Sequence, residues 1–157
     1  MRTLVIGLGN PILGDDAIGW QVIEALKETL DREVSKRVEF ETFSLGGVAL
    51  MERLVGYDRA LIVDALAGRP ETAGTLHRLT LDDLPTLYAD NTHDVSLKTA
   101  LEMGHRLSVH LPQEIVILAV EIDPRWEFSE QMSPAVERAI LPAVLAAEEI
   151  LSTWVFS

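Results

Sequence analysis

Two carboxylates and one imidazole occupy positions in this sequence where a ligand site is expected. Asp16 lies in the glycine-rich stretch Gly7–Gly19, GLGNPILGDDAIG. Asp64 directly follows the apolar run 60–63, and His93 lies in a polar segment that precedes a stretch of helical period. Mixed oxygen and nitrogen ligation suits nickel, zinc or cobalt better than calcium or magnesium. The residue types therefore predict a metal site at Asp16, Asp64 and His93, with coordination positions left open for a substrate.

The two aspartates also have an interpretation that needs no metal. Two carboxyl groups that share a proton can activate a water molecule, provided that they lie within hydrogen-bonding reach of each other. The remaining histidines, His77, His105 and His110, are expected to be structural or solvent-exposed. No H-E-x-x-H and no G-x-S-x-G occurs, so zincin and α/β-hydrolase chemistry have no support.

The glycine-rich stretch resembles a dinucleotide fingerprint only in part. Gly7 and Gly9 supply the first two glycines of G-x-G-x-x-G, but the third position is Ile12. Asp15 and Asp16 would also repel a phosphate from the helix N-terminus that normally attracts it. The stretch therefore favours a cation over a nucleotide. We also expect one of these two carboxylates to cap the following helix.

Composition limits the classes of partner. The chain has 157 residues, 48% of them hydrophobic, which fits a single domain over residues 1–157. A net charge of -12 argues against nucleic acid and anionic membranes as partners. The absence of cysteine excludes disulfides, thiolate metal sites and a cysteine nucleophile. No apolar run approaches the length of a membrane span, and Met1 leads directly into an expected core strand, so we expect a cytoplasmic protein.

Hydrophobic patterning predicts alternating strands and helices. Strands are expected at 3–6, 37–43, 60–63, 75–79 and 114–120, and helices at 18–30, 48–55, from about 97, and from Ser133-Pro134 onward. Asp94 is expected to cap the third helix, 81–92 to be mostly irregular, and Pro142 to kink or restart the last helix. The stretch 68–74 reads as a loop or wide hairpin connection.

This order of elements predicts a three-layer α/β sandwich of the phosphorylase/hydrolase-like kind. It has a mainly parallel five-stranded sheet with helices on both faces. Ligands in such sheets collect beyond the carboxyl ends of the strands. Asp16 and Asp64 follow two strands of the predicted sheet, so the fold class itself would bring them to one edge.

The same residues carry a resemblance to a known family. The chain resembles the NiFe-hydrogenase maturation endopeptidases in the following segments: Leu4–Asn10, Gly14-Asp15-Asp16, Gly19, Asp64 after an apolar strand, His93 before a helix, and Ser133-Pro134 with Glu137. The likeness covers nearly the whole chain. Ala17 stands where many members have glycine, and Asp16 matches an acid that is glutamate in some members.

The resemblance implies a peptide-bond hydrolase of the aspartyl type. The sequence leaves the oligomeric state open, and we expect a monomer. Its substrate would be the precursor of a NiFe-hydrogenase large subunit, from which it removes a C-terminal extension after nickel has been inserted. Asp16, Asp64 and His93 would contact the nickel carried by the substrate, and no tightly bound cofactor of the protein's own is expected. Asp16 and Asp64 are the expected catalytic residues, with Asp16 as general base. The nickel would act either as a Lewis acid or only as a recognition element.

Two other functions remain open. Peptidyl-tRNA hydrolases also begin with a segment like Gly7–Pro11, although here no histidine occurs before His77 and the net charge of -12 is unsuited to tRNA. A non-catalytic metal-binding assembly factor would need the same side chains as the protease. A cleavage assay separates these functions.

Overall fold

The sheet has five strands in the order β2-β1-β3-β5-β4. A computed structural model describes residues 1–83, 97–123 and 131–157. The strands are β1 Thr3–Leu8, β2 Val38–Phe43, β3 Arg59–Ala67, β4 Leu76–Leu79 and β5 Glu114–Ile122. β1 pairs in parallel with β2 and β3, β3 pairs in parallel with β5, and β4 is antiparallel to β5. The expected mainly parallel five-stranded sheet is confirmed.

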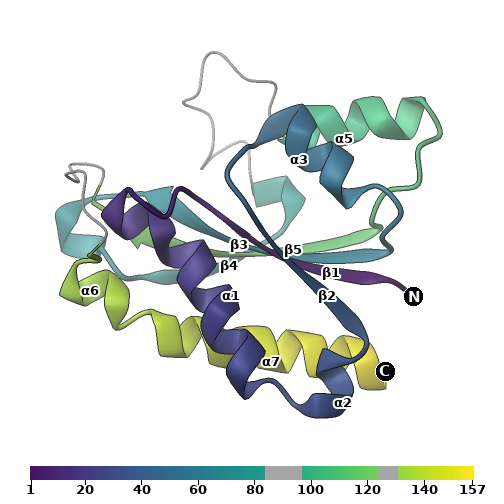
Figure 1. Cartoon of the computed structure of the whole chain (residues 1–157). Helices are drawn as coiled ribbons and strands as arrows, with labels where there is room; N and C mark the ends of the chain where they lie inside the picture. Colours follow the sequence, from purple (N-terminus) through teal and green to yellow (C-terminus); the bar gives the residue numbers. More distant parts are fainter. Residues whose placement is uncertain (84–96, 124–130) are drawn as a thin grey trace.

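The helices form a layer on each face of the sheet (Figure 1). Their bounds are η1 Gly14–Ala17, α1 Ile18–Thr29, α2 Arg32–Ser35, α3 Gly47–Leu54, η2 Pro70–Thr72, η3 Leu81–Asp83, α5 Leu97–Arg106, α6 Pro134–Glu137 and α7 Ile140–Phe156. α1 and α7 cover one face, and α3 and α5 cover the other. The three-layer α/β sandwich is therefore confirmed.

The central strands are apolar on both faces because helices cover both. In β3, Leu61 and Val63 pack toward α1 and α7, whereas Ala60 and Ile62 pack toward α3 and α5. All four side chains are buried. Alternate residues of a strand point to opposite faces, so this continuous apolar run is what a strand covered on both sides requires. Asp64 follows on the face that α3 and α5 cover.

α1 confirms the predicted helical stripe. Ile18, Val22 and Leu26 recur at intervals of four residues and are fully buried against the sheet and α7. Glu24, between Val22 and Leu26, and Glu28, after Leu26, are exposed. The stripe fixes the rotation of α1 about its axis, and with it the direction in which the preceding loop enters the helix.

Of the two structures expected for 68–74, a loop or a wide hairpin, the connection from β3 to β4 is the loop. β5 lies between the two strands, and its ladder with β3 runs unbroken from Arg59↔Glu114 to Ala67↔Ile122. The connection crosses the end of β5, where Gly68 N donates to Ile122 O and Gly74 N donates to Glu121 O. A nine-residue parallel ladder occupies the edge of β3 that a hairpin would have used, so β4 pairs on the far side of β5.

The C-terminal helical region restarts as expected near Pro142. α6 ends at Glu137 and α7 begins at Ile140. Pro142 lies in the first turn of α7, where its missing N–H has no helical acceptor to lose. Residues 84–96 are outside the described residues, so the expected irregular stretch beyond η3 and the expected cap Asp94 stay predictions.

Length and composition alone would allow Pro134–Phe156 to cross a membrane, contrary to the expectation from apolar run length. A core helix passes the same test, and here Val144, Ala147 and Leu151 are buried in the core with α1.

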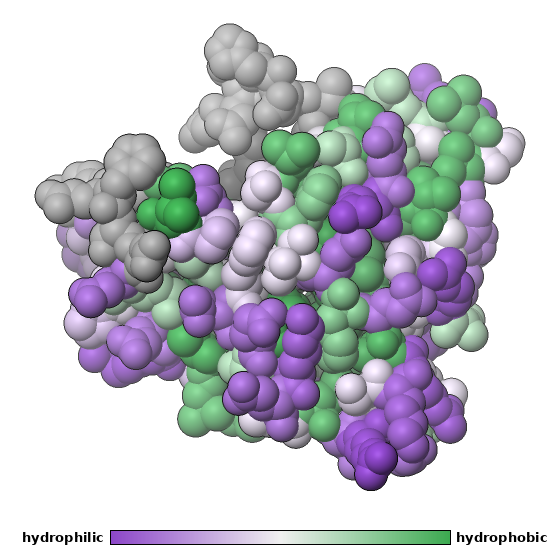
Figure 2. Space-filling view, viewed as in Figure 1, coloured by the Kyte–Doolittle hydropathy of each residue, from purple (hydrophilic) through white to green (hydrophobic). Residues whose placement is uncertain are grey.

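The face shown in Figure 2 mixes hydrophilic and hydrophobic residues, with a hydrophilic concentration where α2 lies in Figure 1.

Candidate active site

The loop after β1 holds Asp16 through two close backbone approaches. Gly9 has φ +136, and a Cβ there would lie 2.0 Å from the backbone oxygen of Asp16. A Cβ on Gly19 would lie 2.3 Å from Leu8 O and 2.5 Å from Val63 O. Any side chain at these positions would push the loop and α1 away from the sheet. The glycines therefore seat the start of α1 on the strand ends, and the phosphate-binding interpretation is not needed to explain them.

Asp16 lies in η1 with a half-buried side chain. Its Oδ2 accepts a hydrogen bond of 2.9 Å from Asn10 N. Burial raises the pKa of the Asp16 carboxyl above its usual value, and the bond from Asn10 opposes this shift in part. Among the described residues, no hydrogen bond reaches Asp16 Oδ1. That oxygen is available for a proton, a water or a cation.

Asp64 lies inside β3, whereas the sequence placed it directly after the strand. The apolar run ends at Val63, but the pairing with β5 continues through Asp64↔Ala119 as far as Ala67. Asp64 Oδ1 accepts a hydrogen bond of 2.7 Å from Ala65 N. Removal of the carboxyl from water, together with the nearby charge of Asp16, raises the pKa of Asp64 to about 7. The side chain is thus held on a rigid strand and can change protonation near neutral pH.

Asp16 and Asp64 are the two carboxyl groups with raised pKa values at this edge of the sheet. Burial is the main cause of the raised pKa of each, and the charge of Asp16 adds a smaller contribution to the raised pKa of Asp64. Asp16 lies in the connection from β1 to α1 and Asp64 lies in β3, and these are the two strands at whose ends the sequence predicted functional carboxylates. A pair of carboxyl groups with raised pKa values can take up and release a proton, or bind a cation that favours their ionised forms.

The third expected ligand, His93, lies outside the described residues. Within residues 1–83, 97–123 and 131–157, no group of three His, Cys, Asp or Glu side chains could hold a metal ion. The described part of the chain supplies two carboxylates toward such a site. The three-residue metal site at Asp16, Asp64 and His93 therefore stays a prediction.

Asp15 has a role that sequence reasoning missed. Ser133 donates its backbone N–H to Asp15 Oδ1 at 2.6 Å and its hydroxyl to Asp15 Oδ2 at 2.8 Å. Asp15 is 7% exposed. The expectation that Asp15 or Asp16 caps the first helix is wrong, because neither η1 nor α1 has a side-chain cap. The adjacent aspartates thus have separate partners, Ser133 for Asp15 and Asn10 for Asp16.

Ser133 occupies the predicted N-cap position before Pro134, but its hydroxyl does not cap α6. The hydroxyl points instead to Asp15. The only sequence signal for this contact was the serine–proline pair itself, which local capping explained equally well.

The histidines outside the candidate site make local polar contacts. His77 Nε2 lies 2.5 Å from Glu121 Oε1, and His110 Nε2 lies 2.9 Å from Asp58 Oδ1. His105 is exposed on α5. These contacts agree with the structural or solvent-exposed roles expected for them.

A family model and several known proteins are similar to this chain along most of its length. The model described as hydrogenase maturation protease, HycI, matches residues 20–151. The Hydrogenase 2 maturation protease of Escherichia coli K12 is 29% identical over 154 residues, which are 97% of this chain and 90% of that protein. A putative hydrogenase maturation protease of Methanocaldococcus jannaschii is 27% identical over 147 residues, 87% of this chain and 90% of that protein.

Solved structures show the same fold. The hydrogenase maturating endopeptidase HybD from E. coli superposes with a TM-score of 0.77 at 28% identity, covering 98% of this chain and 93% of that one. The maturation protease HycI from Thermococcus kodakarensis superposes with a TM-score of 0.68 at 24% identity.

Proposed function

The chain belongs to the hydrogenase maturation protease family, and on that premise we propose that it removes the C-terminal extension of a NiFe-hydrogenase large-subunit precursor after nickel insertion. The observation that supports this proposal is the position of Asp16 and Asp64, two carboxyl groups with raised pKa values, at the carboxyl edge of the sheet. Family membership implies an endopeptidase, and the pair supplies side chains suited to peptide hydrolysis. We also propose that the protein recognises the nickel of the precursor and cleaves only after nickel has been inserted.

Asp16 and Asp64 are the proposed catalytic residues. Each carboxylate has one oxygen held by a backbone N–H, from Asn10 and Ala65 respectively, which fixes its direction. The other oxygen of each has no hydrogen bond within the described residues. Asp16, as general base, takes a proton from the attacking water. Asp64, ionised in the free protein above its pKa of about 7, can take up that proton and return it to the leaving amine.

The substrate's nickel is the proposed recognition element, contacted by Asp16, Asp64 and His93. The two carboxylates are hard ligands, the imidazole is a borderline one, and the set contains no thiolate. Such ligands suit transient contact with a metal that stays with the substrate. The nickel could act in either of two ways. Nickel either polarises the scissile carbonyl or only positions it, in which case the two aspartates act as an aspartic pair. We further propose a monomeric single-domain protein of the cytoplasm with no tightly bound cofactor of its own.

A cleavage assay with matched variants tests the proposed reaction. The precursor of the large subunit encoded in the same genome, loaded with nickel, is incubated with the protein, and mass spectrometry follows loss of the C-terminal extension. The wild-type protein should release the extension, and Asp16→Asn and Asp64→Asn should each slow release by about 100-fold or more. Glu28→Gln, on the exposed side of α1, serves as the control and should cleave at the wild-type rate. If both Asn variants cleave normally, the assignment of the site is wrong.

A further inference from the structure

We propose that the outer edge of β2 binds the C-terminal extension of the precursor as an added antiparallel strand. This inference rests on the proposed function. It names the surface that holds the part of the substrate to be removed, and it concerns residues that lie outside the candidate active site.

β2 has a free edge with backbone groups available for pairing. In the part of the chain that the structure describes, it is the outermost strand of the sheet and pairs only with β1. Gly9 N donates to Phe43 O, so in this parallel ladder Glu39, Glu41 and Phe43 direct their backbone groups toward β1. The alternate residues Val38, Phe40 and Thr42 direct theirs outward, and within the described residues these groups have no partner. The edge is six residues long, about 20 Å.

This edge lacks the usual protection against strand addition. Exposed edges are commonly blocked by proline, bulges, or charged side chains that project over them. β2 contains no proline, and its register with β1 is continuous over all six residues. Its two charges are drawn to other elements: Glu41 pairs with Arg53 at 3.0 Å, and Glu39 Oε1 pairs with Arg2 Nη2 at 3.0 Å.

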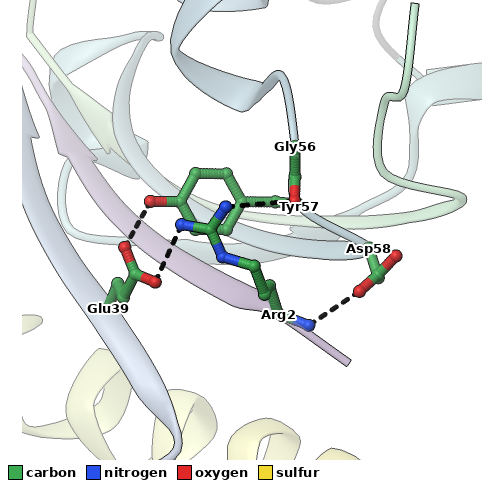
Figure 3. Close-up of polar contacts among 5 residues, drawn as sticks. All are labelled: Arg2, Glu39, Gly56, Tyr57 and Asp58. Carbon is green, nitrogen blue, oxygen red and sulfur yellow. Dashed lines mark hydrogen bonds and ion pairs between the residues drawn. The ribbon is translucent and has the colours of Figure 1, made fainter.

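Figure 3 shows how the Glu39 carboxylate is held. It meets the Arg2 guanidinium through one oxygen, while Tyr57 OH donates to the other at 2.5 Å. Arg2 lies directly before β1 and Tyr57 shortly before β3, so both partners lie at the starts of interior strands. The Glu39 carboxylate is therefore held toward the interior strands and away from the free edge of β2.

The edge is continuous with the candidate active site. Phe43 O, at the end of β2, accepts hydrogen bonds from Gly9 N at 3.1 Å and from Trp20 Nε1 at 3.2 Å. Gly9 is followed by Asn10, whose N–H holds Asp16. Two apolar residues of the neighbouring loops, Ile12 and Leu45, are 53% and 58% exposed. A peptide on the β2 edge would thus run directly toward the catalytic pair and past apolar contacts.

The direction of the added strand follows from where the nickel must lie. β2 runs toward the site, because its carboxyl end is next to Asp16. The folded part of the precursor carries the nickel and must therefore sit at this end. Only the extension beyond the scissile bond has a free end that can run back along β2, and it would do so antiparallel to the strand. Strand addition of this kind draws affinity from main-chain hydrogen bonds.

A proline substitution at the edge tests this role in turnover. Thr42→Pro removes an outward N–H and leaves the ladder with β1 intact, whereas the control Thr42→Val keeps the N–H. We expect Thr42→Pro to raise KM for the precursor about tenfold with kcat nearly unchanged, and Thr42→Val to match the wild type. Equal KM values for the two variants would contradict the proposal.

Amide exchange on the wild-type protein provides a test that needs no cleavage and no variant. A synthetic peptide with the sequence of the extension should slow exchange at the outward amides of Phe40 and Thr42, and leave the β1-bonded amide of Glu41 unchanged. Single N-methylation along the peptide should weaken binding at every second position only. Unchanged exchange at Phe40 and Thr42 at saturating peptide would overturn the edge as the docking surface. If the wild-type protein left the precursor uncut, the proposed function would fail, and the exchange result would still decide this proposal.

Discussion

Ser133 donates two hydrogen bonds to Asp15, one to each carboxylate oxygen, and so ties the start of α6 to the loop that carries Asp16. The two residues are 118 positions apart in the chain. Since Asp15 is almost fully buried and adjacent to Asp16, the C-terminal helical region helps to determine where the candidate catalytic carboxylate lies. The pair of adjacent acids is thus one structural anchor and one candidate catalytic group.

Asp15→Asn should destabilise the fold. The amide can keep its oxygen toward Ser133 N, but its NH2 group then faces the Ser133 hydroxyl, which must change from donor to acceptor, so both charge-assisted bonds to the carboxylate are lost. We expect the free energy of unfolding to fall by about 1–3 kcal/mol, measured by urea denaturation. Ser133→Ala removes only the hydroxyl bond and should cost less, about 1 kcal/mol. An Asp15→Asn protein as stable as the wild type would show that the contact is not an anchor.

Asp64→Asn should stabilise the fold, in a pH-dependent manner. The pKa of Asp64 is raised from 3.8 to about 7, so the folded state binds the proton more tightly than the unfolded state does. This difference lowers stability progressively as pH rises from about 4 to 7, and the full cost is present above 7. Asn removes that cost, on the order of 2 kcal/mol at pH 8 for a half-buried group, and changes little near pH 4. Urea denaturation at the two pH values measures both. Equal stability of the two proteins at pH 8 would contradict the raised pKa.

Gly9→Ala should disrupt the site. The added Cβ would lie 2.0 Å from Asp16 O at a φ of +136, so the loop would have to move. We expect a loss of about 2 kcal/mol or more in the free energy of unfolding, together with strongly reduced cleavage. The matched control is Gly46→Ala, since a Cβ at Gly46 meets nothing within 4 Å and the backbone φ is -112. Similar behaviour of the two variants would remove the proposed role of the close approach.

The pH dependence of kcat/KM should reveal the ionisation of Asp64. This parameter reports ionisations of the free enzyme, and the ionised form of Asp64 is the one that would meet the substrate's nickel. We therefore expect kcat/KM for precursor cleavage to rise with pH and level off above about 7. The titration of Asp64 in the free protein, followed by NMR of its carboxyl carbon, should show the same midpoint. A profile that falls between pH 6 and 8 would contradict this assignment.

The sequence was sufficient to predict the fold and the position of two candidate site residues, for clear physical reasons. Apolar runs at 3–6 and 60–63 mark strands covered on both faces, and parallel strands bring the residues after them to one edge. Asp16 and Asp64 could be placed by that rule. The ladder with β5 continued past the end of the apolar run, however, so Asp64 lies within β3 and not after it.

Contacts between distant segments could not be predicted from local patterns. Local capping rules assigned Asp15 or Asp16 to α1 and Ser133 to α6, and gave no sign that Asp15 and Ser133 would meet. A wide hairpin was one of two structures expected for 68–74, because strands adjacent in sequence often pair, but β5 occupies the edge of β3 and the connection is a loop. Whether His93 joins the two aspartates stays a prediction.

The nickel dependence of cleavage tests the central claim most directly. The purified protein is mixed with the large-subunit precursor in nickel-loaded and nickel-free forms, and the mass of the precursor is followed over time. We predict loss of the extension from the nickel-loaded form only, and no loss with Asp64→Asn. Cleavage of both forms at the same rate would contradict nickel recognition, and cleavage of neither would contradict the proposed reaction.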